Sequence, residues 1–289
     1  GPPQQGAENV NSQLSGKDQR FYFKGRWLTA AQYKQASGGA PQGGTGTGSA
    51  PATGGTNLFP SLGPGVIRAN SSAFCANSFT PGGAYPGVKN CANGRAEKSK
   101  IAEDTLGNTT FEATMRNATA DGGYGLGYVH AGTANGILKG LGTNNNKCQG
   151  YLAKQGCIDY NNANVANEVV KRLTRVAVES KAQGANGLRI DQGDICQTGN
   201  GTDRGCEANF NKAMLKLSKN LKNENMAIVI NNNPGTTKAL IDYERQGKGA
   251  HVAAAMVDSR PKDLDYAVNL TRDAIGNNDV PIITVVSRG

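Results

Sequence analysis

Histidine is scarce in this sequence, which has only His130 and His251, and no two cysteines form a C-x-x-C pair. Structural zinc sites need several Cys or His ligands at close spacing, so zinc is not expected. The G-x-S-x-G motif of a Ser-His-Asp hydrolase and the G-x-x-x-x-G-K-S/T loop of a P-loop protein are also missing. The Gly-rich stretches 122–127 and 136–142 lack the context of a dinucleotide-binding loop. We therefore expect neither a metal nor any other cofactor.

Long apolar runs and aromatic side chains are scarce as well. No run approaches the roughly 18 residues of a membrane span, and we expect none. The net charge of +9 is spread along the chain, and aromatic residues make up only 6%, with Trp27 as the one tryptophan. Proteins that bind nucleic acid more often combine a basic stripe with interleaved aromatic residues, so nucleic acid is not expected as a partner. The charge favours a soluble basic surface, with a preference for anionic or neutral partners as the alternative interpretation.

The cysteines fall into sequence-local couples. They are Cys75 with Cys91, Cys148 with Cys157, and Cys196 with Cys206, which are 16, 9 and 10 residues apart. An even number of cysteines in Gly- and Asn-rich, loop-like stretches predicts three short disulfides, whereas free buried thiols would lie in apolar helix or strand patterns. Disulfides persist in oxidising compartments, so we expect a secreted, periplasmic or cell-surface protein.

The first 56 residues differ in composition from the rest. Residues 1–56 are mostly Gly, Gln, Ser, Thr, Ala and Pro, and they begin without Met, as in a mature or trimmed chain. An aromatic segment interrupts them, and it predicts a short hairpin and helix motif at 21–36 that docks on the rest of the chain or on another protein. A flexible linker is predicted at 37–56. Residues 57–289 are enough for one barrel domain.

Short apolar runs alternate with helical patterns from residue 58 onward. Strands are predicted at 65–68, 123–129, 187–190, 226–230, 252–257 and 281–286. Helices are predicted at 165–183, around the apolar face of Phe210, Met214, Leu217 and Leu221, and at 237–245 and 263–275. Strands that are apolar on both sides and alternate with helices indicate a parallel sheet covered by helices.

Polar clusters directly follow the predicted strands. These clusters are residues 130–133, 191–194, 231–233, 258–260 and 287–288. In a (β/α) barrel, catalytic residues come from the carboxyl ends of several strands, whereas an open Rossmann sheet concentrates its site at one crevice. The pattern therefore favours an α/β protein with a (β/α)8 TIM-like barrel.

Carboxylates are the candidate catalytic groups on this face. Asp191 and Asp258 each follow a different strand, and cleavage of a glycosidic bond requires one carboxylic acid and one carboxylate. Asp194 is expected to contact substrate, with capping of a helix or binding of a cation as the alternatives, and His130 to contact substrate or make a structural hydrogen bond. The predicted substrate-binding residues are Tyr128, His130, Asp194, Asn231 and Arg260.

Three segments resemble motifs of one enzyme family. Residues 184–194, Gly-Ala-Asn-Gly-Leu-Arg-Ile-Asp-Gln-Gly-Asp, are similar to the pattern G-x-D-G-hydrophobic-x-x-D-N-x-D, residues 127–132 to C-Y-x-x-x-G, and residues 228–232 to a later K-N strand. In this order the motifs resemble the endo-α-1,4-polygalactosaminidase family of TIM-barrel glycosidases, over residues 123–289. The resemblance implies a TIM barrel with Asp191 as a catalytic carboxylate.

The sequence departs from that family at several motif positions. Gln192 stands in place of Asn, Asn186 in place of Asp, and Asp258 where a Glu is expected, while Asp194 and Asn231 match as site residues. An Asp is one methylene shorter than a Glu, which changes the carboxyl separation that distinguishes inverting from retaining enzymes. The family's cationic galactosamine polymer does not suit a chain of charge +9, so the substrate is not transferred.

Two functions from different classes follow from these patterns. The first is a secreted, endo-acting glycoside hydrolase that cleaves a microbial surface or matrix polysaccharide with paired carboxylates. The second is a catalytically silent barrel that binds polysaccharide or serves as a structural or assembly component of the cell surface. In both cases the partner is a polysaccharide.

Overall fold

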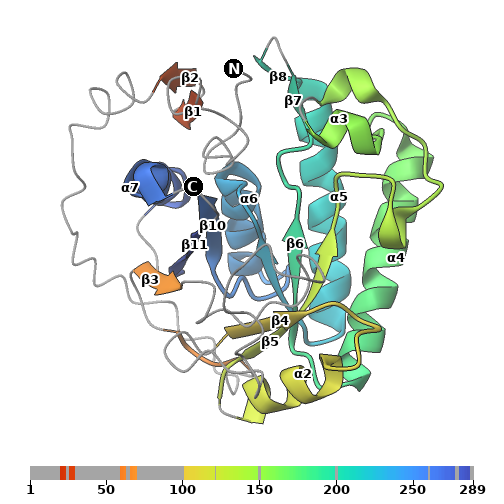
Figure 1. Ribbon diagram of the computed structural model, residues 1–289, viewed down its shortest axis with the longest axis vertical. Helices are drawn as coiled ribbons and strands as arrows, with labels where there is room; N and C mark the ends of the chain where they lie inside the picture. The colour runs from red at the N-terminus through yellow and green to blue at the C-terminus, as the bar shows by residue number, and fades with distance from the viewer. Residues whose placement is uncertain are drawn as a thin grey trace.

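The computed structural model describes ten parts of the chain (Figure 1). They are residues 20–23, 26–29, 59–62, 66–69, 101–120, 122–148, 151–198, 201–259, 261–276 and 280–286. Several predicted features lie outside the described residues: the helix at 30–36, the linker at 37–56, the Cys75–Cys91 disulfide and Arg260.

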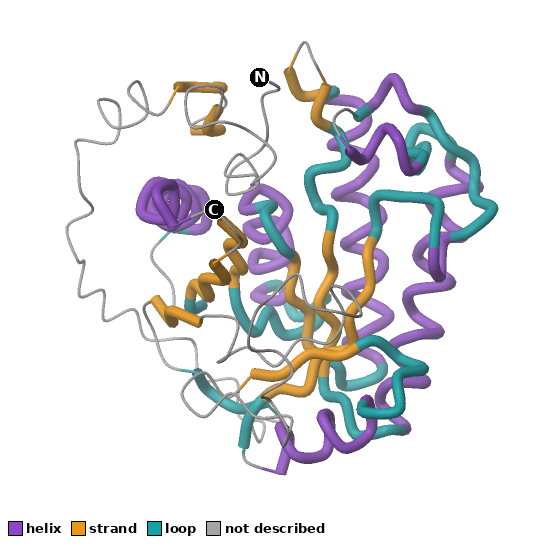
Figure 2. Tube along the Cα trace, in the orientation of Figure 1, coloured by secondary structure: helices purple, strands orange, loops and turns teal. Residues whose placement is uncertain are grey.

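Parallel strands form the centre of the described structure (Figure 2). They are β3 (Val66–Ala69), β4 (Ile101–Asp104), β5 (Tyr124–His130), β6 (Gly187–Asp191), β9 (Ala227–Ile230), β10 (Ala255–Ser259) and β11 (Ile282–Val286). One sheet has the order β4-β5-β6-β9 and a second has the order β10-β11-β3, with all pairs parallel. Two isolated parallel bridges, Ile228 with Val252 and Asn231 with Met256, join β9 to the chain of β10.

The strands therefore follow one another in space in chain order, and the first of them, β3, pairs with the last, β11. The predicted α/β class with a parallel sheet is confirmed. Within the described residues the series has seven strands, and no ladder joins β3 to β4, so these residues do not make up a complete (β/α)8 barrel.

Helices alternate with these strands along the chain. They are α2 (Phe111–Ala120), α3 (Tyr151–Gln155), α4 (Ala163–Ala182), α5 (Arg204–Asn223), α6 (Pro234–Arg245) and α7 (Leu264–Ile275), with short 3-10 turns η4 (Gly136–Leu138), η5 (Asn145–Lys147) and η6 (Pro261–Asp263). Three of them begin at capping side chains: Asn162, Asp203 and Asn233 accept hydrogen bonds from backbone N–H groups in the first turns of α4, α5 and α6. These caps satisfy donors that have no partner within the helix.

Strands β4, β5, β6, β9, β10 and β11 bury side chains on both of their faces. One apolar cluster joins strand residues such as Leu188, Ile190 and Ile228 to the inner faces of the helices. A second cluster consists of strand residues of the opposite parity, among them Val229 and Met256, together with the segment 59–62. Because side chains alternate along a strand, the sheet has a helix-covered face and an enclosed inner face. This arrangement explains why the strands read as continuous apolar runs.

The predicted elements agree with most of the structure, but strand β4, helix α2 and the short elements α3 (Tyr151–Gln155), β7 (Gln197–Thr198) and β8 (Gly201–Thr202) were missed. All six predicted strands are present within a few residues, and the helix bounds agree closely except that α6 begins at Pro234, before the predicted residue 237. Strand β4, Ile-Ala-Glu-Asp, was missed because two of its four residues are acidic. Helix α2 was missed because its apolar face is short, with Phe111 and Met115 as its large buried side chains.

An aromatic cluster covers the amino-terminal end of the sheet. Phe59 stacks on His251 with ring centroids 5.1 Å apart, and the hydroxyl of Tyr124 donates to the carbonyl of Pro60 at 2.6 Å. His251 Nδ1 lies 2.6 Å from Glu244 Oε1. His251 thus has the structural role that its place before a strand suggests, and the described part of the domain includes the segment 59–62.

The predicted hairpin near the amino terminus is present. β1 (Arg20–Phe23) pairs antiparallel with β2 (Arg26–Thr29), with Phe23 opposite Arg26. β1 lies beside α7, which places the hairpin against the chain's own helix.

Two of the three predicted disulfides lie in the described residues, and both pairings are confirmed. Cys148 pairs with Cys157 and Cys196 with Cys206, with Cα atoms 6.3 Å and 5.5 Å apart, within the usual range for disulfides. Cys206 lies in the first turn of α5 and not in a loop. In the part of the chain that the structure describes, no helix is long and apolar enough to cross a membrane.

Candidate active site

Polar side chains gather where the parallel strands end. His130 and Asp191 are the last residues of β5 and β6 and lie directly opposite each other in the register of the two strands. Asn231 follows β9, its N–H donates to the carbonyl of Ile190, and its backbone bridges to Met256 of β10. Asp258 lies two residues beyond Met256 on the same face of β10. The structure therefore brings these predicted residues to one edge of the sheet.

Three hydrogen bonds hold the carboxylate of Asp191 in place at this edge. Its Oδ1 accepts hydrogen bonds from Asn231 Nδ2 at 2.9 Å and from the backbone N–H of Gln192 at 2.8 Å. Its Oδ2 accepts from the hydroxyl of Tyr128 at 2.7 Å. The side chain is still 20% exposed, so the carboxylate is anchored but reachable from solvent.

A buried arginine lies directly beneath this carboxylate. Arg189 is fully buried, and its Nη1 lies 3.7 Å from Asp191 Oδ2 while its Nε lies 3.5 Å from Glu103 Oε2. Glu103, on β4, is also fully buried. The guanidinium lies over the ring of Tyr128, 5.2 Å from its centre. Glu103, Arg189, Tyr128 and Asp191 are defined here as the charged network.

The network sets the protonation states of the groups above it. Burial alone would raise the pKa of Asp191, but the guanidinium of Arg189 and the hydrogen bonds from Asn231, Tyr128 and Gln192 lower it below its usual value. Burial, together with the Asp191 carboxylate, raises the pKa of Tyr128 well above its usual value. Asp191 is therefore an ionised acceptor and Tyr128 a neutral donor at neutral pH.

His130 lies beside Asp191, but its burial favours the neutral form of its imidazole ring. Burial lowers the pKa of His130, and the nearby charge of Asp191 offsets only part of this effect. Its Nδ1 is buried and has no hydrogen-bond partner among the described residues, and the same holds for Oδ1 of Asn231. Two buried polar atoms next to Asp191 thus lack a protein partner within the described part of the chain.

Asp258 is placed by a reciprocal hydrogen-bond pair with the loop after β9. The Asn232 side chain accepts from the backbone N–H of Asp258 at 2.8 Å and donates to its carbonyl at 3.2 Å. Asn232 has a positive φ of 54°, a conformation that Asn tolerates better than most residues. Asp258 is half-buried as a residue, and the Oδ1 atom of its carboxyl group is buried.

Asp194 lies deeper than a surface contact residue would. It is 8% exposed, in the tight turn that follows β6. At Gly193 a Cβ atom would come within 2.8 Å of the Asn231 carbonyl and 3.0 Å of the Asn233 Cβ, so only glycine fits there. The predicted substrate-binding role of Asp194 stays a prediction, because the side chain is mostly enclosed.

Gln192 and Asn186, two of the departures from the family pattern, have structural contacts. Gln192 has a positive φ of 61°, and its Oε1 accepts from the Gly132 N–H at 3.2 Å and the Thr133 hydroxyl at 2.9 Å. Asn186 accepts from the Gly125 N–H at 3.0 Å and donates to the Gly123 carbonyl at 3.1 Å. Both amides join β6 to β5 and its loop.

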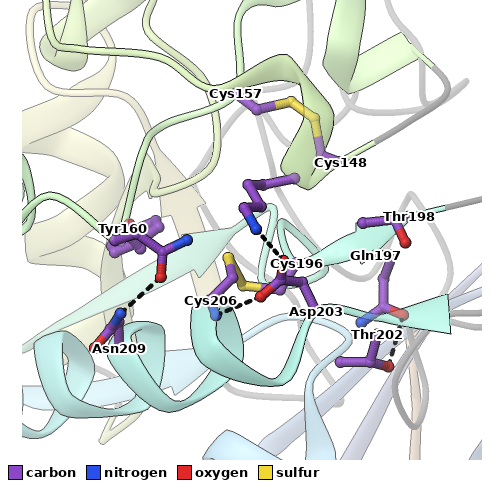
Figure 3. The surroundings of a disulfide bond; sticks show 12 residues. Cys148, Cys157, Tyr160, Cys196, Gln197, Thr198, Thr202, Asp203, Cys206 and Asn209 are labelled. Atoms are coloured by element: carbon purple, nitrogen blue, oxygen red, sulfur yellow. Dashed lines mark hydrogen bonds and ion pairs between the residues drawn. A yellow bond between two sulfur atoms is a disulfide. The ribbon is translucent and has the colours of Figure 1, made fainter. Parts of the chain in front are cut away.

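The two disulfide-bonded loops form a wall beside this edge (Figure 3). Lys147, next to the Cys148–Cys157 bridge, pairs with Asp203, which also caps α5 by accepting from the N–H of Cys206 at 2.8 Å. Figure 3 shows Asp203 next to the Cys196–Cys206 bridge. Asn209 of α5 donates to Asn161, in the loop before α4, at 2.9 Å. The loops after β5 and β6 are thereby held together by two covalent bonds and one ion pair.

Sequence reasoning missed the acid and the arginine of the network. Glu103 was not considered because its strand was not predicted, and Arg189 was counted as part of an apolar strand. One signal could have identified Arg189: charged residues are almost never fully buried without a partner, and this one lies inside a strand that is buried on both faces. Asp104, by contrast, accepts from Thr105, Asn108 and Thr110 and so shapes the loop before α2.

No group of three His, Cys, Asp or Glu side chains among the described residues is arranged to hold a metal ion. A scan against protein-family models finds no match to the chain, and a search of curated proteins finds none with significant similarity.

Proposed function

We propose that the protein is an endo-acting glycoside hydrolase, which cleaves internal glycosidic bonds of a polysaccharide. The observation that carries this proposal is the ionised but reachable Asp191 at the carboxyl end of β6, with Asp258 on the same face two strands away. In (β/α) enzymes this edge of the sheet holds the catalytic residues. Glycosidic cleavage needs two carboxyl groups in different protonation states.

The two acids take different roles in this proposal. Asp191, whose pKa is lowered, acts as the base that activates water, and Asp258 protonates the leaving oxygen. Neighbouring strands lie about 4.8 Å apart, so the backbones of Asp191 on β6 and Asp258 on β10, two strands apart, are separated by about 10 Å. Their side chains are on the same inner face, so their carboxyl groups are closer together than their backbones. This spacing favours an inverting mechanism, which needs about 6.5–9.5 Å between carboxyl groups.

The orphaned polar atoms beside Asp191 support a sugar ligand. Oδ1 of Asn231 is an acceptor, and Nδ1 of His130 is a donor or an acceptor according to the tautomer. A buried polar group without a partner is costly unless a ligand or water satisfies it. Sugar hydroxyls both donate and accept, and so match both atoms.

We further infer a closed (β/α)8 barrel of the polygalactosaminidase-like family. The chain-order arrangement of the strands, the pairing of β3 with β11, and the separate apolar cluster on the inner face support closure. The disulfides support a secreted, periplasmic or cell-surface location.

A second function is a catalytically silent polysaccharide-binding barrel, and one observation favours it. Both oxygens of Asp191 already accept hydrogen bonds, and Arg189 faces one of them. A carboxylate with so many partners is a weak base, since each hydrogen bond stabilises its ionised form. In this case Asp191 would order the mouth of the site and take no proton.

Hydrolysis of a panel of neutral and charged polysaccharides separates the two functions. We expect Asp191→Asn and Asp258→Asn each to lower the cleavage rate at least about 100-fold, as loss of acid or base catalysis does. Asp242→Asn, at an exposed acid on α6, is the matched control and keeps the wild-type rate. Measurements are made below the melting temperature of every variant. A wild-type protein that binds one of these glycans but cleaves none would establish the silent barrel.

A further inference from the structure

A second surface of interest lies on the outside of the domain, on α4 and α5. The two helices carry nine of the 31 Lys and Arg residues and only three of the 22 Asp and Glu residues. They therefore account for six units of the net charge of +9, although they are only 40 of the 289 residues. The two helices thus carry a larger share of the net charge than their length would give, which corrects the expectation that the charge is spread along the chain.

The two helices lie side by side along their whole length, as Figure 1 shows. Polar contacts join them at four levels: Asn161 with Asn209, Asn167 with Lys216, Thr174 with Asn220, and Lys181 with Glu224. The pairs advance in the same direction on both helices, so the helices are parallel. Their outward faces therefore form one continuous surface.

Five cations lie on this surface. Lys212, Lys216 and Lys219 are at positions i, i+4 and i+7 of α5, and Lys171 and Arg175 are at i and i+4 of α4, so each set shares one face of its helix. All five are exposed. We call these five residues the basic face.

None of the five cations of the basic face forms an ion pair within the described residues. Glu168 pairs with Arg172 at 3.1 Å and Glu224 with Lys181 at 3.9 Å, so these acids are engaged by other cations, and Glu179, four residues after Arg175, is the one acid of α4 on the same side. No carboxylate of the described residues lies within ion-pair distance of the five cations. Like charges at helical spacing repel one another, and an anionic partner relieves this repulsion.

A shallow groove of about 110 Å³ lies between the amino-terminal halves of the two helices. Its polar lining consists of Lys212 and Lys216 and the amides of Asn161, Asn167 and Asn209. Tyr160 is the one aromatic residue of the lining, and it is buried, with its hydroxyl bonded to the carbonyl of Ala131. The groove offers charge and amide hydrogen bonds but no exposed ring.

We propose that the basic face and its groove bind an anionic polysaccharide, a polymer of uronic acids or sulfated sugars. The cations match its carboxylate or sulfate groups, and the asparagine amides match its hydroxyls. Single-stranded nucleic acid is less suited, because it is bound by stacking on exposed aromatic side chains. The candidate active site is acidic, with Asp191, Asp194 and Asp258, so a polyanion is excluded from it and held on the outer wall.

The groove lies near the candidate active site. α4 begins in the connection that follows the carboxyl end of β5 and α5 in the connection that follows the carboxyl end of β6, so the groove between their amino-terminal halves and the candidate active site lie toward the same end of the domain. A polyanion on the basic face would hold that end close to an anionic matrix. This inference does not depend on hydrolysis and holds for either function above.

Fluorescence anisotropy with a labelled heparin oligosaccharide tests the proposal. The test variant is Lys212→Gln/Lys219→Gln, and the control is Lys248→Gln/Lys262→Gln, which removes the same charge from exposed positions elsewhere. We expect the test variant to bind about tenfold more weakly at about 50 mM salt, with a shallower salt dependence, and the control to stay within about twofold of the wild type. Circular dichroism checks that both variants are folded.

Three outcomes would overturn the proposal. Equal weakening in both variants would mean that only net charge matters. A wild-type protein without measurable heparin binding at low salt would show that the basic face is merely solvated. Tighter binding to a DNA duplex than to heparin, lost in the same test variant, would assign the face to nucleic acid.

Discussion

At the scale of single residues, the fully buried Arg189 is the side chain on which the site depends. Two fully buried charges, on Arg189 and Glu103, are taken out of water at a cost of several kcal/mol each, which their attraction repays only with good geometry. The same guanidinium also faces Asp191 and keeps that carboxyl group ionised. A single side chain thus connects the interior of the sheet with the chemistry at its edge.

Removal of this arginine alone should be far more harmful than removal of the pair. We expect Arg189→Met to lower the free energy of unfolding by about 3–5 kcal/mol, because Glu103 is left as a buried charge. The double variant Arg189→Met/Glu103→Leu should recover a large part of this loss. Urea denaturation of both single variants and the double variant forms the cycle. Additive effects would show that the two side chains do not interact.

At the scale of elements, the loops after β5 and β6 behave as one unit. Two disulfides, the Lys147–Asp203 ion pair and the hydrogen bonds of Gln192 tie them to each other and to β5. Loops are the usual carriers of binding residues, and they need support to hold a fixed geometry. This wall gives the candidate site one rigid side.

Asp203 has two roles in this wall that substitution can separate. We expect Asp203→Ala to lower the free energy of unfolding by about 1–2 kcal/mol, because it loses both the cap of α5 and the pair with Lys147. Asp203→Ser keeps a capping oxygen and should lose less than about 1 kcal/mol. Thermal and urea unfolding at pH 7 measure both. An equal loss in the two variants would assign the stability to the ion pair.

Most strands and helices could be predicted from the sequence because their apolar residues are regularly spaced. Strands that are buried on both faces and helices with apolar residues three and four apart were found from periodicity, and the local cysteine pairings followed from spacing. Strand β4 and its Glu103 were not found, because an acid in the sheet interior contradicts the apolar pattern and is explained only by Arg189 from another strand. The hydrogen bonds from Tyr128 and Asn231 to Asp191 depend on the register of the strands, which could not be predicted from the sequence.

At the scale of the whole molecule, the segment 59–62 closes the end of the sheet opposite the candidate site. Phe59 and Leu62 pack on the inner apolar cluster, and Phe59 stacks on His251. The inner apolar cluster therefore includes residues that precede strand β3.

Phe59→Ala tests this closure. We expect the free energy of unfolding to fall by about 2–3 kcal/mol, below the usual range for a fully buried Phe because Phe59 is only half-buried. Ile137→Ala, at an exposed apolar residue of η4, is the control and should change stability by less than about 0.5 kcal/mol. Urea denaturation measures both. Equal stability of the two variants would leave the segment outside the folded core.

The pairing of β3 with β11 also sets an order of events during synthesis. β3 is the first strand of the series to leave the ribosome, and the edge that pairs with β11 waits for this partner until β11 emerges near the end of the chain. At about 5–20 residues per second this delay lasts roughly 10–40 s. A strand edge that waits for its partner is a template for pairing with other chains, so the chain is most open to aggregation before the β3–β11 pair forms.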